Sequence, residues 1–191
     1  MTITDSDDPA VWIVRAPEVR QDWFVRWSSL HGVQHTRRVH VHAQRLAEEL
    51  GWPRADAELV LHAALLHDIG RLGDGVEPGH GASGVERADE LGLLTALPDE
   101  DAAVVRFAIL RHSLPDDGAR EHAEGLAAAS DPARRLADPA RALRILWLLK
   151  DADALDRIRL GFGERADPRQ LRCERARELL GFAEALYAAS R

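Results

Sequence analysis

The feature that most constrains this chain is an apolar run over residues 58–70 that ends in a histidine next to an aspartate. Its apolar side chains recur on nearly every side, which is typical of a helix buried on most of its faces. His67 falls on the same helical stripe as Val60, Ala63 and Ala64. A histidine and a carboxylate are costly to bury without partners. The run therefore predicts either an interior metal site or a histidine–carboxylate pair that satisfies itself.

The composition predicts an all-α protein. Alanine, leucine, arginine and glutamate dominate, all good helix formers, and alternating β-branched runs are nearly absent. A chain of 191 residues is long enough to bury one proper core. We expect a partly disordered tail over residues 1–17, because it opens with a polar, acidic stretch, and one compact multi-helix domain over residues 18–191.

Charge and cysteine content exclude several classes of protein. The net charge is −7 and the basic residues are scattered, which argues against a nucleic-acid-binding face. Cys173 is the only cysteine, which excludes a disulfide framework or a thiolate site. No apolar run approaches the roughly 20 residues of a membrane span, and no signal-peptide pattern opens the chain. We therefore expect a cytoplasmic protein without a membrane partner; the aromatic segment 18–30 is a candidate homodimer surface.

Start and stop signals divide the chain into helices and loops. The loop 71–81 holds four glycines and a proline, and residues 113–137 are a variable insert or lid with one short helix. Gly70 stands where a glycine commonly ends a helix. The other predicted helices, beside the central run and a short helical pattern in 18–30, span residues 31–50, 83–91, 99–112, 121–129, 138–158 and 168–189.

Several of these helices carry a histidine on their apolar face. Extending the apolar stripe of the 31–50 helix backwards reaches His35, and His112 closes the stripe of the 99–112 helix. Leaving one such group buried and unpaired costs about 1–3 kcal/mol, whereas one shared cation would satisfy them all. The inward-pointing ionisable groups are His35, His67, Asp68, His80, His112 and one aspartate near residues 151–153.

Periodicity does not choose between the two aspartates. Asp153 follows Leu149 and Leu146 on one stripe, and Asp151 follows Leu148 on the neighbouring stripe. Both remain candidates on the pattern alone.

Three local strings give the chain a family resemblance. They are His-Gly-Val-Gln-His-Thr-Arg-Arg-Val at 31–39, Leu-His-Asp-Ile-Gly-Arg at 66–71 and Ala-Asp-Ala-Leu at 152–155. In this order they resemble the motifs of the HD-domain superfamily of metal-dependent phosphohydrolases, with Arg71 where many members carry lysine. The resemblance covers residues 31–159. It implies an all-α fold and a metal site built from His35, His67, Asp68 and Asp153.

His80 and His112 bear on the number of metal ions. Family members with two ions carry two further histidines between the second and last motifs, and His80 and His112 stand in that interval. The resemblance thus implies a dinuclear site bridged by Asp68. Ser113 follows His112, so the adjacent histidine pair of the members that cleave cyclic-di-GMP is absent, as is their Gly-Tyr-Pro motif. We set that activity aside.

The resemblance implies that a metal-activated hydroxide attacks a small phosphate ester such as a nucleotide. A mixed imidazole and carboxylate shell favours Mn²⁺ or Fe²⁺, with Co²⁺, Ni²⁺ and Zn²⁺ as alternatives, over Mg²⁺. Arg38, Arg71 and Lys150 flank the motifs and are candidates to contact the phosphate oxygens, alongside Asp68 at the reacting centre. The acidic net charge favours a small phosphorylated substrate over a polymer.

Two alternatives belong to other classes of function. HD-fold diiron oxygenases, such as inositol oxygenase and a phosphonate-cleaving oxygenase, use the same ligand order. In them a lysine follows the fourth histidine by one helical turn, where this chain has Asp116. The third hypothesis is a non-catalytic, metal-stabilised binding module.

The remaining histidines carry less of the argument. His31 lies one turn before His35 and is a candidate to support a ligand. His42 shares the inner edge of its helix without motif support. We expect His40, His62 and His122 at the surface.

Overall fold

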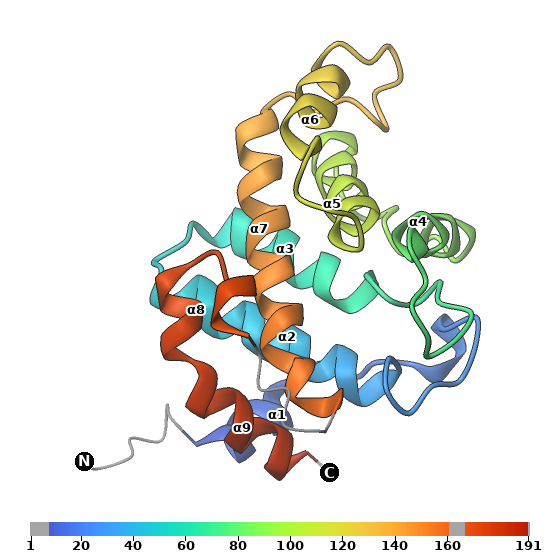
Figure 1. Cartoon of the computed structure of the whole chain (residues 1–191). Coiled ribbons are helices and arrows are strands. Elements are labelled where there is room, and N and C mark those ends of the chain that lie inside the picture. The colour runs from blue at the N-terminus through green and yellow to red at the C-terminus, as the bar shows by residue number, and fades with distance from the viewer. Residues whose placement is uncertain (1–7, 161–166, 191) are drawn as a thin grey trace.

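The protein is described by a computed structural model over residues 8–160 and 167–190, and within these ranges it contains helices and no strand. Figure 1 shows the long helices crossing one another at the centre of the molecule. The prediction of an all-α fold is confirmed. The helices that form the core are α2 (Val33–Glu49), α3 (Arg54–Leu66), α5 (Asp99–His112) and α7 (Pro139–Leu155).

Helix α7 lies at the centre of the packing. Asp138 caps its first turn by accepting a hydrogen bond from the backbone N–H of Arg141, and Pro139 occupies the first turn, where no N–H partner is needed. Leu146 and Leu149 are fully buried. The helix packs against α2, α3 and α5, so its C-terminal end lies beside the ends of the other core helices.

Shorter elements surround this core. Among the described residues, no helix is long and apolar enough to span a membrane. The peripheral helices are α1 (Pro9–Arg15), α4 (His80–Glu90), α6 (Ala119–Ala127), α8 (Glu174–Glu178) and α9 (Leu180–Ala189), with 3₁₀ turns at Gln21–Trp23, Asp156–Leu160 and Pro168–Gln170.

The N-terminal segment differs from the expected loose tail over 1–17. Asp8 caps α1, and the buried side chains of Trp12 and Ile13 pack with Leu186 of α9. The Val-Trp-Ile-Val run inside α1 has a strand-like composition, which hid the helix signal of Asp8 and Pro9. Residues 1–7 lie outside the described residues.

Two other expected helices are shorter or broken. The predicted pattern in 18–30 forms only the 3₁₀ turn Gln21–Trp23. The predicted helix over 168–189 is divided into α8 and α9. Its first part is extended because the Asp151 carboxylate accepts hydrogen bonds from the backbone N–H groups of Arg172 and Cys173, which a continuous helix would use internally.

Helix α4 begins at His80, three residues before the predicted Ser83 cap, and packs unusually close to its neighbours. A Cβ atom on Gly81 would overlap the carbonyl oxygens of Ile109 and Leu110 in α5. A Cβ atom on Gly70 would overlap the backbone of α4 itself. Gly70 is not among the glycines with positive φ, so it serves this close approach and not the left-handed helix end expected from the sequence.

The glycine contacts predict a selective loss of stability. Gly81→Ala should lower the free energy of unfolding by about 1–3 kcal/mol, because backbone must shift to admit the methyl group. Gly125 lies inside α6, and a Cβ atom added there would meet open space. Gly125→Ala should leave stability unchanged or raise it by up to about 1 kcal/mol. Urea denaturation of both variants checks this, and equal effects would contradict the packing argument.

Two histidines of α2 are buried and form no ion pair with a carboxylate of the described residues. His42 is fully buried, packs edge-on to the Phe182 ring and has no hydrogen-bond partner on either ring nitrogen within the described residues. His40, expected at the surface, is also buried because it faces the packed side of α2. His62 and His122 are partly exposed. Burial lowers the pKa of both His40 and His42 to about 4.

These low pKa values predict acid sensitivity. The pKa of a histidine in the unfolded chain is about 6.5, whereas that of native His40 and His42 is about 4. Between these two pH values the two histidines bind protons in the unfolded chain but not in the native protein. The free energy of unfolding should therefore decrease as the pH is lowered through this window, by up to about 1.4 kcal/mol per pH unit for each histidine. His42→Leu should make the decline shallower. Urea unfolding of the unsubstituted chain and the variant at several pH values measures the slopes, and parallel slopes would refute the assignment.

Candidate metal centre

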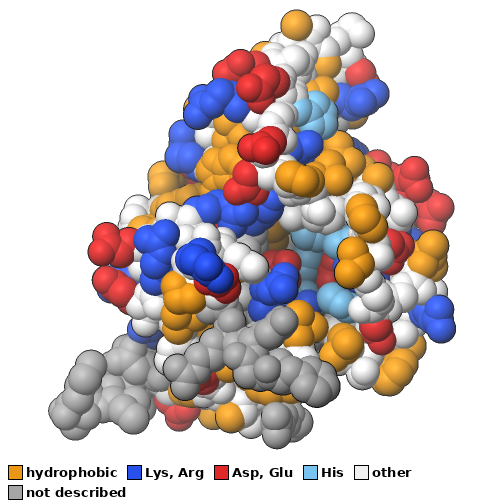
Figure 2. All heavy atoms as spheres, viewed as in Figure 1, with side chains coloured by type: hydrophobic (Ala, Val, Ile, Leu, Met, Phe, Trp, Pro, Cys, Tyr) orange, Lys and Arg blue, Asp and Glu red, His pale blue; other side chains and the backbone are white. Residues whose placement is uncertain are grey.

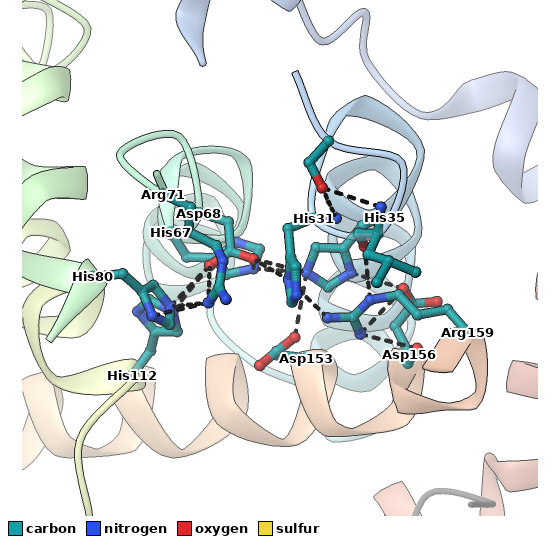
Figure 3. A network of polar contacts seen from close by, with 12 residues as sticks. His31, His35, His67, Asp68, Arg71, His80, His112, Asp153, Asp156 and Arg159 are labelled. Atoms are coloured by element: carbon teal, nitrogen blue, oxygen red, sulfur yellow. Dashed lines mark hydrogen bonds and ion pairs between the residues drawn. The ribbon is translucent and has the colours of Figure 1, made fainter. Parts of the chain in front are cut away.

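Six side chains from five helices or their ends converge at one place in the fold. Figure 3 shows them pointing toward one another between α2, α3, α4, α5 and α7. Subsets of these residues, and His31, bring potential ligand atoms within 4.8 Å of one another. They are His35 on α2, His67 and Asp68 at the end of α3, His80 at the start of α4, His112 at the end of α5 and Asp153 near the end of α7.

Local hydrogen bonds fix the orientation of three of the imidazoles. In each, Nδ1 donates to the backbone carbonyl oxygen three residues earlier, so Nε2 carries the lone pair in the neutral ring. The donor–acceptor distances are 2.8 Å for His67 to Ala64, 2.7 Å for His80 to Glu77 and 2.6 Å for His112 to Ile109.

His35 is oriented by a carboxylate that the sequence analysis missed. Its Nδ1 lies 2.7 Å from Oδ2 of Asp156, which is fully buried. Arg38 donates to the other oxygen of Asp156 over 2.6 Å. Although burial raises the pKa of Asp156, the partners His35 and Arg38 outweigh it and hold that pKa well below its usual range. The only signal in the sequence was its place one turn after Asp153.

Arg38 is therefore not placed as a phosphate contact. It lies one turn after His35 on α2, with its guanidinium bound to Asp156 and 5.1 Å from the centre of the Tyr187 ring. Both partners are on the buried side of His35, away from the Nε2 atoms. The structure gives Arg38 a supporting position, in contrast to the sequence expectation.

The Asp68 carboxylate lies between two groups of imidazoles. Its Oδ2 lies 3.4 Å from Nε2 of His35 and 3.7 Å from Nε2 of His67. Its Oδ1 lies 2.9 Å from Nε2 of His80 and 3.5 Å from Nε2 of His112. Burial alone raises the pKa of Asp68, but the surrounding imidazoles outweigh it and hold the pKa well below its usual range.

The Nε2 atoms face one another in pairs. They are 3.1 Å apart between His35 and His67, and 2.8 Å apart between His80 and His112. If both rings of a pair are neutral with Nδ1 protonated, both Nε2 atoms present a lone pair and neither satisfies the other. Although burial lowers the pKa of His35, its hydrogen bonds to Asp156 and Asp68 outweigh burial and raise that pKa. Burial lowers the pKa of His67 to about 3, which keeps it neutral and available as a ligand. The donor set therefore fits a divalent transition metal.

The structure places Asp153, and not Asp151, beside the imidazoles. Oδ1 of Asp153 lies 3.4 Å from Nε2 of His35. Asp151 points to the opposite side of α7, where it accepts hydrogen bonds from the backbone of Arg172 and Cys173 over 2.9 and 2.8 Å. The ambiguity left by helical periodicity is resolved by the partners of the two carboxylates.

Of the remaining predicted cations, Arg71 lies at the centre and Lys150 does not. Nη1 of Arg71 is 3.9 Å from Oδ1 of Asp68, and its Nη2 donates to the carbonyl of Gly75 over 2.7 Å. Lys150 donates instead to the carbonyl of Leu114 over 2.6 Å and to Asp116. Its ammonium is thus held by the loop that follows α5.

His31 and Arg159 lie on another side of Asp68, and no signal in the sequence singled out Arg159. Nδ1 of His31 lies 3.0 Å from Oδ2 of Asp68 and 3.1 Å from Nη2 of Arg159. His31 therefore supports Asp68, as its position one turn before His35 suggested. Arg159 belongs to the 3₁₀ turn after α7, one residue beyond the helix predicted over 138–158.

The centre opens into a cleft of about 560 Å³ lined by His31, Asp68, Arg71 and Arg159 among others. Figure 2 shows histidine side chains within a hollow of the surface, with basic side chains at its edge. Asp68 and the imidazoles thus lie at the base of a site that a small molecule can enter.

Comparison with known proteins gives one match. A family model described as HD domain matches residues 32–158, which is more than half of the chain. No curated protein and no solved structure matches the chain.

The contrast between the two aspartates predicts distinct phenotypes. Asp153→Asn should lower the affinity for Mn²⁺ by about 10-fold or more, because a charged ligand is lost. Asp151→Asn should leave Mn²⁺ affinity within about twofold but lower the melting temperature, because the anchored C-terminal segment loses charge-assisted hydrogen bonds. Calorimetric titration with Mn²⁺ and thermal unfolding measure the two effects. An exchange of the two phenotypes would contradict the assignment of ligands.

Proposed function

Given that the chain belongs to the HD-domain family, we propose that it is a metal-dependent phosphohydrolase acting on a small phosphate ester such as a nucleotide. The observation that carries the proposal is the Asp68 carboxylate set between four imidazoles whose Nε2 atoms all lie within 3.7 Å of its oxygens. Nε2 of His80 also lies 3.2 Å from Nη1 of Arg71, whereas the Nε2 atoms of the other three imidazoles have no donor outside the cluster among the described residues. Here they converge on the base of an open cleft.

We propose that the site holds two ions, with Mn²⁺ or Fe²⁺ preferred and Co²⁺, Ni²⁺ or Zn²⁺ as alternatives. The two oxygens of Asp68 face separate groups, which supports a bridging role. His35, His67 and Asp153 would hold one ion, and His80 and His112 the other. When bound, such ions supply Lewis acidity that lowers the pKa of water and polarises a phosphoryl oxygen.

The protein itself would bind and orient the phosphate. Arg71 and Arg159 line the cleft beside Asp68 and are the cations best placed to meet phosphate oxygens. Asp156 holds the ring of His35 in place from behind. The cleft is concave and the net charge is −7, which favours a small phosphorylated molecule over a nucleic acid.

The direct test is turnover of p-nitrophenyl phosphate and a nucleotide panel by the purified chain with Mn²⁺. Asp68→Ala should lower kcat/KM by at least about 100-fold, since the residue contacts both groups of ligands. Glu124→Ala removes an exposed carboxylate of α6 and should leave kcat/KM within about twofold. Inductively coupled plasma analysis of both variants reports the metal content.

Three outcomes separate the classes of function. Turnover that persists without O₂ supports the phosphohydrolase. Strict dependence on O₂, with iron in the purified protein, would transfer the chain to the oxygenases. Absence of turnover on every phosphate, with metal bound, would favour the non-catalytic binding module.

A further inference from the structure

We propose that the substrate carries a second phosphate besides the one that reacts, and that Lys150, Arg157, Arg172 and Arg177 bind it. These four residues are called the cationic wall below. The inference rests on the proposed function and adds a substrate class to it: a molecule with two phosphates.

The cationic wall lines a cavity that adjoins the metal centre. This cavity has a volume of about 530 Å³. It shares His112, Pro115, Asp153 and Arg157 with the cleft that contains Asp68. These shared residues place the cavity next to the cleft, so a group attached to a phosphate beside Asp153 lies close to the cationic wall.

Two cations of the wall form no ion pair with a carboxylate of the described residues, although the charge of Arg157 helps to lower the pKa of Asp167. Arg157 makes no hydrogen bond or ion pair within this part of the chain, and it lines both the cavity and the cleft. Arg177 donates only to backbone carbonyl oxygens, those of Pro168 at 3.1 Å and Leu171 at 2.7 Å. Carbonyl oxygens fix the guanidinium of Arg177 but leave its net charge in place.

The other two cations are held rigidly and share their carboxylates. Lys150 and Arg172 both contact Asp116, at 2.5 and 2.8 Å, and lie over the Trp147 ring at 5.7 and 5.4 Å from its centre. Arg172 also reaches Asp151. The four cations of the wall thus have two carboxylates among them, Asp116 and Asp151. The cavity is also lined by Asp153 of the metal centre and by Arg169, which pairs with Asp167. A positive surplus remains, although the whole chain is acidic.

The two sides of the site differ in charge. The far side of the cleft includes Asp74 and Glu77, which repel an anionic group, so a second phosphate is favoured only on the side of the cationic wall. Arginine forks match phosphate oxygens in pairs. The cations face a cavity rather than a broad surface, which suits a small anion and not a polymer.

The test compares ligands with one and two phosphonate groups, which cannot be hydrolysed. The full chain, loaded with Mn²⁺ and desalted, is titrated calorimetrically with methylphosphonate and with methylenediphosphonate. Arg157→Gln should raise the Kd for methylenediphosphonate by about 10-fold, the value of one charge-assisted contact, and leave that for methylphosphonate within about twofold. Arg157→Lys should recover part of the loss. Arg120→Gln, which removes an exposed charge on α6, should change neither Kd.

Kinetics provide the second measurement. In Arg157→Gln, the KM for a nucleoside diphosphate should rise by about 10-fold, several times more than any change in kcat/KM for p-nitrophenyl phosphate. An equal effect on both ligands, no effect on either, or no preference of the unsubstituted chain for the diphosphonate would overturn the cationic wall. Selective diphosphonate binding with no phosphate hydrolysed would instead retain the cationic wall and reject the phosphohydrolase.

Discussion

Crowding of buried imidazole nitrogens around one carboxylate is the constraint on which the arrangement of this protein depends. Two pairs of Nε2 atoms lie 3.1 and 2.8 Å apart, and in neutral rings with Nδ1 protonated such atoms do not satisfy one another. Leaving such groups unpaired costs about 1–3 kcal/mol each. The fold holds them in place through their other nitrogens, which donate to carbonyl oxygens or to Asp156. Stability is thus given up at the centre of the molecule, and a bound cation would restore it.

The ends of the helices explain how the fold tolerates this centre. Helices α3, α5 and α7 all direct their C-terminal ends toward it, and such ends carry about half a negative charge each. The carbonyls that hold His67 and His112 belong to the last turns of α3 and α5, where carbonyl groups lack partners within the helix. The same hydrogen bonds therefore cap two helices and aim two ligands. Helix α4 adds His80 only because Gly81 allows it to lie against α5.

The sequence predicted the class of fold, most core helices and the convergence of ligands, because burial of ionisable groups on apolar stripes is a local pattern. It did not separate Asp151 from Asp153, since both lie on apolar stripes of one helix and their partners are distant in the chain. It misplaced Arg38 for the same reason: a motif gives the position on the helix but not the carboxylate that the side chain meets. Asp156, Arg159 and the closeness of α4 depend on packing between elements, which no local pattern contains.

Asp151 and Asp153 of α7 contact different parts of the structure. Asp153 faces the imidazoles, within the residues matched by the family model. Asp151 holds the backbone at Arg172 and Cys173, beyond the matched residues, and so positions Arg172 beside the cavity that adjoins the centre. One turn of α7 therefore contacts both the imidazoles, through Asp153, and the C-terminal segment, through Asp151. If the proposed function holds, a change in that segment would alter which phosphates bind without altering the donors around Asp68.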